Sequence, residues 1–388
     1  MWGTGASSTQ CEGAAPQSDY IDREREGVVP VSGTGIDFST RYAEDFAIYT
    51  SLGLNHHRLS IEWARIEPEK GKRDPAALEH YRNVLTAAHD TGITPWITLH
   101  HFTLPRWFAD EGAFAVEANR TNYWARHVDF MAEAFGDLAG GWKPVNETNY
   151  YGMIAGGVLG GSKVDAAGRR VVDRQIHLAT CEAAATLRQT GKPVASIYGL
   201  SGVVAMDDKP ETAALVDKFF REHWEGIHLF RDGAFVDKNG ETVERPDLQG
   251  CFDIIGFSYY ASMGVRDGAL LYRYPEDAPQ SPLGYGIWPD GLDLVLNRLH
   301  EEVPGVPLMI SEYGIGTDDD EVRAAYIARG LAIANAAIVR GVNLQAFFHW
   351  TGVDNYEWRH GYDVKFGVID ADRNIKPSAY VLQAEALA

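Results

Sequence analysis

The sequence predicts an α/β fold, a single (β/α)8 barrel in which residues 1–388 form one domain. Short apolar or β-branched runs that end in polar or aromatic residues recur eight times, and helical segments with a 3.6-residue period lie between most of them. Alternating strands and helices imply parallel strands with right-handed crossovers, and eight such units can close a barrel. No low-complexity linker divides the chain, which favours one large barrel over two or three domains.

The predicted strands lie near residues 2–4, 56–60, 95–100, 142–146, 194–198, 252–258, 307–311 and 344–349. The predicted helices include residues 41–52, 76–91, 123–135, 172–190 and 321–340. A doubly wound open sheet is the alternative architecture, and it usually carries a glycine-rich phosphate turn after the first strand. Here Gly3 and Gly5 are followed by Ser8 where a third glycine would stand, so the dinucleotide-binding fingerprint fails.

Net charge indicates which classes of ligand the protein can bind, and cysteine content indicates its cellular compartment. The formal net charge of −19 argues against a nucleic-acid partner and suits a neutral or cationic ligand. The three cysteines, Cys11, Cys181 and Cys251, show no CxxC spacing and are expected to be reduced, buried thiols, which fits a cytoplasmic protein. We find neither a signal-peptide pattern nor an apolar run long enough to span a membrane.

Two carboxylates stand at the ends of predicted strands, where the active site of a barrel forms. Glu147 follows the fourth strand and Glu312 follows the seventh, so the two can face each other across the barrel mouth. Cleavage of a glycosidic bond needs two carboxyl groups in different protonation states. A lone strand-end glutamate is as often a partner in an ion pair. Asn146 beside the first and Arg58 within reach of the second favour a catalytic pair.

Two histidine pairs raise the alternative of a metal site. They are His56–His57 and His100–His101, and neighbouring residues in a strand point to opposite faces. Neither pair can therefore supply two ligands to one ion, and no HExxH motif occurs. A serine hydrolase is also disfavoured, because the chain has no GxSxG motif. We expect no metal and no cofactor.

A series of motifs over nearly the whole chain carries a resemblance to a known family. They are WGTGASSTQCEG (2–13), HRLSIEWAR (57–65), TLHHFTLP (98–105), NE (146–147), GFSYY (256–260), SEYG (311–314) and HWTGVDNYEW (349–358), followed by FG (366–367). On these motifs the sequence resembles glycoside hydrolase family 1, the β-glucosidase and β-galactosidase family. The resemblance implies an exo-acting, retaining β-glycosidase whose partner is a small-molecule β-glycoside.

The resemblance also implies roles for individual residues. Glu147 corresponds to the acid/base and Glu312 to the nucleophile, and repulsion between them would keep Glu147 protonated. Arg58 would hold Glu312 ionised, Tyr260 would hydrogen-bond it, and Asn146 would bind the sugar 2-hydroxyl. The implied substrate-binding residues are Gln10, His101, Glu357 and Trp358 for the remaining hydroxyls, Trp350 as the platform beneath the sugar, and Tyr285 on the aglycone side.

Several positions depart from the common pattern of that family. They are Ser258 for an asparagine, Tyr313 for an asparagine, Thr148 for a proline, Phe102 for a tryptophan and Tyr285 for a tryptophan. The segments 154–164 and 198–252 look trimmed, which predicts a more open aglycone side. The Glu357–Trp358 pair favours an unphosphorylated sugar.

The remaining alternatives concern the substrate and the type of activity. β-Glucosides are expected first, with β-galactosides and β-fucosides next. A β-glycanase or disaccharide-releasing enzyme on the same barrel is a second reading, and a non-catalytic sugar-binding homologue is a third. The presence of both carboxylates argues against the third. The sequence gives no indication of the oligomeric state.

Overall fold

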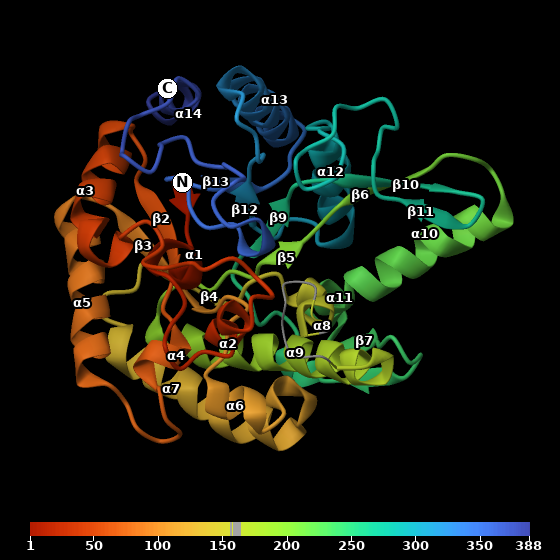
Figure 1. Ribbon diagram of the computed structural model, residues 1–388. Helices are drawn as coiled ribbons and strands as arrows, with labels where there is room; N and C mark the ends of the chain where they lie inside the picture. The colour runs from red at the N-terminus through yellow and green to blue at the C-terminus, as the bar shows by residue number, and fades with distance from the viewer. Residues whose placement is uncertain (156, 158–163) are drawn as a thin grey trace.

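The computed structural model of the chain describes residues 1–155, 157 and 164–388, and eight parallel strands form its centre (Figure 1). The strand order is β4-β3-β2-β1-β13-β12-β9-β5. The bounds are β1 (Trp2–Gly5), β2 (His56–Ser60), β3 (Thr94–His100), β4 (Gly141–Val145), β5 (Tyr198–Gly199), β9 (Ile255–Tyr259), β12 (Leu308–Tyr313) and β13 (Leu344–His349). The amide of Trp142 donates to Pro193 O and that of Ala195 to Trp142 O, both at 2.9 Å, which joins β4 to the segment before β5. The predicted (β/α)8 barrel is confirmed.

Helices surround the strands (Figure 1). Asp74 shows how one begins: its carboxylate accepts a hydrogen bond from Ala76 N, and Pro75 occupies the first turn, where a missing N–H costs nothing. The five predicted helices correspond to α3, α5, α7, α9 and α13. The α-helices are α1 (Ser8–Glu12), α2 (Tyr20–Arg25), α3 (Phe38–Ser51), α4 (Trp63–Ile66), α5 (Pro75–Asp90), α6 (Arg106–Asp110), α7 (Ala125–Phe135), α8 (Tyr151–Ala155), α9 (Ala166–Leu187), α10 (Pro210–His223), α11 (Glu225–Asp232), α12 (Gly291–Glu302), α13 (Asp320–Val339) and α14 (Ala379–Ala386).

Smaller elements extend the loops of the barrel, and the sequence pattern did not predict them. A three-stranded sheet pairs β11 (Ala269–Leu271), β10 (Ser262–Arg266) and β6 (Gly202–Ala205), and it projects to one side together with α10 (Figure 1). A hairpin pairs β7 (Ala234–Val236) with β8 (Thr242–Glu244). The short helical turns are Ala113–Ala115, Asn119–Trp124, Thr148–Tyr150, Arg188–Thr190, Pro246–Leu248 and Trp358–His360.

Side chains fill the barrel, so its interior is a packed core and not a channel. Trp96, Met309 and Phe348 belong to a separate buried cluster contributed by several strands. A much larger buried cluster packs the strands against the helices. The three cysteines are buried and form no disulfide. With the interior filled, the functional residues have to be sought at the carboxyl ends of the strands.

Helix α13 corrects one expectation from the sequence. By length and composition alone it is apolar enough to cross a membrane. In the fold it packs against α12, α14 and β13, and residues such as Ile327, Leu331 and Ala334 on its inner face are buried. The buried face of the apolar run therefore packs in the core between the strands and the surrounding helices.

Candidate active site

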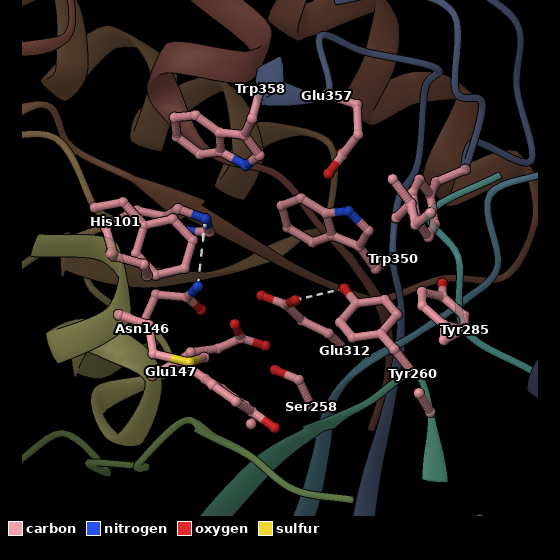
Figure 2. Close-up of a pocket in the computed structure, with 18 of the residues that line it drawn as sticks. His101, Asn146, Glu147, Ser258, Tyr260, Tyr285, Glu312, Trp350, Glu357 and Trp358 are labelled. Carbon is pink, nitrogen blue, oxygen red and sulfur yellow. Dashed lines mark hydrogen bonds between the residues drawn. The ribbon is translucent and has the colours of Figure 1, made fainter. Parts of the chain in front are cut away.

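A cavity of about 320 Å³ opens at the carboxyl ends of the strands. Ten of the residues predicted for the site line it: Gln10, His101, Asn146, Glu147, Tyr260, Tyr285, Glu312, Trp350, Glu357 and Trp358. All of them except Gln10 are labelled in Figure 2. Arg58, fully buried on β2, lies beneath the wall and contacts three of these side chains. Segments that are far apart in the sequence thus meet at one mouth.

The carboxylate of Glu312 is held at both oxygens. Tyr260 donates its hydroxyl proton to Oε2 at 2.6 Å, and Arg58 donates Nη1–H to Oε1. The pairing of β12 with β9 shifts register between Ile310 and Glu312. A bulge of this kind redirects a side chain, so that Ile310 packs in the large core while Glu312 faces the cavity.

Arg58 organises the wall beside the nucleophile candidate. Its Nε donates to Thr98 Oγ1 at 2.7 Å, and Nη2 donates to Asn146 Oδ1 at 2.5 Å. Nη2 also lies 3.0 Å from His101 Nδ1, and since a guanidinium only donates, Nδ1 has to accept. Burial, and then the charge of Arg58, lower the pKa of His101 well below its usual value. The imidazole is therefore neutral.

Glu147 occupies a tight turn at the end of β4. Its backbone is left-handed with φ 43°, and it is held there because Tyr150 N donates to Glu147 O at 2.9 Å and Asn146 N donates to His100 O at 2.9 Å. Phe102 (φ 72°) and Trp358 (φ 45°) also line the cavity in left-handed conformations. Backbone strain of this kind collects at functional sites, where the surrounding structure holds it in place.

The carboxyl of Glu147 is shifted toward its protonated form. Burial raises its pKa to about 8, and the charge of Glu312 is the next cause. The expectation that repulsion from Glu312 is what raises the pKa of Glu147 was therefore wrong about the main cause, because desolvation of the carboxyl raises this pKa more than the charge of Glu312 does. Glu147 is the group in the cavity suited to give a proton, and Glu312, held by Arg58 and Tyr260, is suited to attack.

The opposite end of the cavity is closed by a hydrogen-bonded pair. Gln10 Nε2 donates to Glu357 Oε2 at 3.1 Å and to Tyr356 O at 2.8 Å, while Gln10 Oε1 accepts from Ser7 at 2.7 Å. Burial, and then Glu312, raise the pKa of Glu357 to about 8. Gln10 is thus fixed in orientation, and Glu357 presents a carboxyl to the cavity.

Aromatic rings form the walls at this end. His101 stacks on Trp350 at 5.8 Å between ring centroids and on Trp358 at 6.1 Å, with interplanar angles of 19° and 16°. Gly5 on β1 makes room for this, because a Cβ there would lie 3.0 Å from the Trp350 ring. Flat apolar faces beside hydrogen-bonding groups suit a ring-shaped polyol.

The cavity wall also contains residues that sequence reasoning missed. They are Tyr150, Met153, Ile154, Gly199, Leu200, Ser201, Ala261, Leu283 and Phe366. Most are apolar, and apolar residues after a strand look like core residues in a sequence. Gly199 is a glycine for a reason that only the structure shows: a Cβ there would lie 2.2 Å from the Tyr150 ring and 3.3 Å from Glu147 Oε1.

Of the positions that depart from the common family pattern, some line the cavity and others do not. Ser258, Phe102 and Tyr285 line the cavity, whereas Tyr313 does not and donates its hydroxyl proton to Tyr326 O at 2.9 Å. Thr148 Oγ1 lies 3.2 Å from Thr180 Oγ1, under the turn that carries the acid/base candidate. Within the trimmed segment 154–164, residues 156 and 158–163 lie outside the described residues.

The histidine pairs separate as strand geometry requires. His101 faces the cavity, while His100 packs against Phe114 and Tyr151. His57 stacks on Tyr49, and His56 Nδ1 accepts from Trp96 Nε1 at 3.1 Å. Across the described ranges, no three His, Cys, Asp or Glu side chains come together in a way that could hold a metal ion.

Comparison with known proteins gives a consistent result. The pattern of Glycosyl hydrolase family 1 matches residues 1–212 and 236–384. Beta-glucosidase A of Thermotoga maritima is 28% identical, over 98% of this chain and 95% of that protein. A β-glycosidase structure from Pyrococcus horikoshii superposes with a TM-score of 0.87 at 28% identity and covers 99% of this chain and 93% of its own. A T. maritima β-glucosidase in complex with glucoimidazole shares the fold, with a TM-score of 0.89 at 23% identity and coverage of 99% and 97%.

Proposed function

The chain belongs to glycosyl hydrolase family 1 and is a β-glycosidase, and from this premise we propose that it is an exo-acting enzyme that hydrolyses terminal β-D-glycosyl residues with retention of configuration. The observation that carries the proposal is the contrast between two carboxyls of one cavity. Glu312 is bound by Arg58 and Tyr260, while burial raises the pKa of Glu147 to about 8. Retaining hydrolysis requires this division between an ionised nucleophile and a protonated acid.

The proposed reaction has two steps. Glu312 attacks the anomeric carbon while Glu147 gives its proton to the leaving oxygen, which forms a glycosyl ester on Glu312 and releases the aglycone. The charge of Glu312 is then lost, so the pKa of Glu147 falls and its carboxylate takes a proton from water. The oxygen of that water bonds to the anomeric carbon as the ester bond breaks. Asn146, oriented by Arg58, supports the 2-hydroxyl.

The sugar-binding end suits a neutral glycone. We assign Gln10, His101, Glu357 and Trp358 to its hydroxyls and Trp350 to the face beneath it, with β-glucosides first and β-galactosides or β-fucosides next. Among the described residues the cavity wall includes no lysine or arginine, so a sugar phosphate would bring a dianion beside carboxyls with no cation in the wall to neutralise it. Cleavage of a 6-phosphoglucoside in preference to the free glucoside would contradict this assignment.

The aglycone side is proposed to be open. Met153 lines the cavity and is 44% exposed, and Tyr285 is assigned to this side. We further propose that residues 1–388 unfold as one domain, since a continuous core includes residues from Ala6 to Leu382. A cytoplasmic location is proposed from the three buried thiols. Two separate calorimetric transitions would contradict the single domain.

The test uses p-nitrophenyl β-glycosides with gluco, galacto, fuco, xylo and 6-phosphogluco groups. Wild type is expected to cleave at least one and to release the β-anomer first, as seen by NMR. Glu312→Ala should be inactive until azide enters the vacated face and yields the α-glycosyl azide. Glu147→Ala with azide should yield the β-glycosyl azide, because the ester on Glu312 still forms.

A matched control distinguishes loss of chemistry from loss of fold. Glu225 is a buried glutamate that lies 3.2 Å from His177, away from the cavity wall. Glu225→Gln should keep the activity of wild type and show no response to azide. An α-anomer as the first product would exclude retention, and a folded wild type that binds glycosides but cleaves none would favour the sugar-binding alternative.

A further inference from the structure

Ser258 is a buried hydroxyl in the active site without an assigned role. It lies on β9, is 1% exposed, and pairs in register with Glu312 on β12. Figure 2 shows its hydroxyl directed toward the carboxyl of Glu147. Across the described part of the chain, Ser258 Oγ has no hydrogen-bond partner of full geometry. A buried polar group left in this state costs free energy. The partner within its reach is the Glu147 carboxyl, whose pKa a hydrogen bond from Ser258 lowers.

We propose that Ser258 is a positioning residue that donates a hydrogen bond to the Glu147 carboxylate while Glu147 acts as the base toward water. The inference rests on the proposed function, because it concerns the second step of that reaction. Ser258 keeps its own proton throughout. The proton that moves comes from water and goes to Glu147, the water oxygen bonds to the anomeric carbon, and the bond to Glu312 breaks.

The need for such a donor follows from the surroundings of Glu147. Burial is the first cause that raises the pKa of this carboxyl, and it persists after Glu312 has become an ester. The influences that act in the opposite direction are Ser258 and Arg58, and Arg58 is already hydrogen-bonded to Glu312, Asn146 and His101. Ser258 is the donor with nothing else to bind.

The other ionisable groups around Glu147 do not replace this hydroxyl. They are Glu312, Glu357, Tyr150 and Tyr260. Glu312 has no proton to donate once it is an ester, Glu357 lies at the sugar end of the cavity beside Gln10, and Tyr260 already donates to Glu312. A serine hydroxyl can also rotate, so it can accept from the protonated acid in the first step and donate to the carboxylate in the second. The asparagine that is usual here in the family would have to flip its amide to do both.

The experiment follows the pH dependence of kcat with 2,4-dinitrophenyl β-glycosides of the sugar series above. This leaving group departs without a proton, so hydrolysis of the ester limits kcat, and the acidic limb of the profile reports ionisation of Glu147 in the intermediate. Loss of one hydrogen bond to a charged group should move that limb up by about one pH unit, a tenfold fall in kcat at low pH. Ser258→Ala should show the shift.

Shape-matched variants keep the test decisive. Ser258→Thr retains the hydroxyl and should keep the wild-type limb, while Ser258→Val, of nearly the same shape, should shift it as alanine does. Ser311→Ala is the control, since Ser311 is buried, lies on the same strand as Glu312 and has an unpartnered hydroxyl, but does not line the cavity. It should not move the limb.

Each outcome has a distinct meaning. Coinciding acidic limbs for wild type, Ser258→Val and Ser258→Ala in active enzymes would overturn the role of Ser258 and leave the proposed function intact. Failure of both Glu312→Ala and Glu147→Ala to form a glycosyl azide would overturn the proposed function itself. A shift in the threonine variant equal to that in valine would assign the effect to shape and also overturn the proposal.

Discussion

Replacing Glu147 by glutamine should make the protein less sensitive to alkaline pH. The pKa of Glu147 is raised from 4.5 to about 8, so the folded state binds more protons than the unfolded state between these values. The stabilising contribution of the protonated carboxyl is complete below about pH 4.5 and is lost as the pH rises through about 8. A shift of this size corresponds to about 3 to 5 kcal/mol, where the lower figure allows for solvent that reaches this half-buried side chain from the cavity.

The assay is thermal unfolding of wild type and Glu147→Gln at pH 5 and pH 9. With an unfolding entropy of about 0.8 kcal/mol/K for a chain of this length, the variant should gain about 4 to 6 °C in Tm relative to wild type between the two pH values. Glu276→Gln is the control, because Glu276 is exposed, the neighbouring Arg266 lowers its pKa, and it is ionised at both pH values. Parallel Tm curves for wild type and Glu147→Gln would refute the argument that burial keeps Glu147 protonated.

Three further substitutions test other parts of the structure. Tyr260→Phe removes the 2.6 Å hydrogen bond to Glu312 and should lower kcat/KM by about 10- to 100-fold in steady-state kinetics, with unchanged Tm in thermal unfolding. An unchanged kcat/KM would contradict a role for this hydrogen bond in catalysis. Gly199→Ala places a Cβ 2.2 Å from the Tyr150 ring, so we expect about 1 to 3 kcal/mol of destabilisation in urea and a fall in kcat, and wild-type values for both would show that the turn has room. Arg373→Met leaves the buried Asp45 without its ion-pair partner and should lower the free energy of unfolding in urea by about 3 to 5 kcal/mol. A loss of less than about 1 kcal/mol would contradict a stabilising role for this buried ion pair.

The barrel was predictable because its signals are local and repeated. Strands β2 and β13 have the predicted bounds, and in β13 an apolar run, Ala346 to Phe348, ends in the polar His349. Helix α9 begins at Ala166, earlier than the predicted residue 172, because Asp165 caps it and accepts from Gly168 N. The polar cavity residues were predictable for a related reason: a charged or amide side chain at the end of an apolar strand is unusual in a core.

Other features depend on packing that no local pattern records. Leu200 and Ala261 line the cavity but have the composition of ordinary core residues. The parallel pairing of β6 with β10 joins the loops behind β5 and β9 and has no local pattern, whereas β10 and β11 form a hairpin around Asp267–Gly268, a local signal that the sequence reasoning missed. The dominant cause of the Glu147 pKa was also beyond reach, because burial is a property of the assembled wall and not of residue spacing.

The balance of charge at the mouth decides which carboxyl is ionised. Glu147, Glu312 and Glu357 line the cavity, and within the described ranges no lysine or arginine lines it with them. Arg58 approaches from beneath and binds Glu312, which therefore holds the negative charge. Lys143 cannot neutralise a second carboxylate, because burial, and then the charge of Arg58, lower the pKa of its amine well below the usual value. Its Nζ lies 4.6 Å from the centroid of the Phe348 ring. With one guanidinium for three carboxyls, Glu147 and Glu357, whose pKa values are raised to about 8, favour their protonated forms near neutral pH. In the proposed reaction they would serve as the acid and as a neutral donor to the sugar.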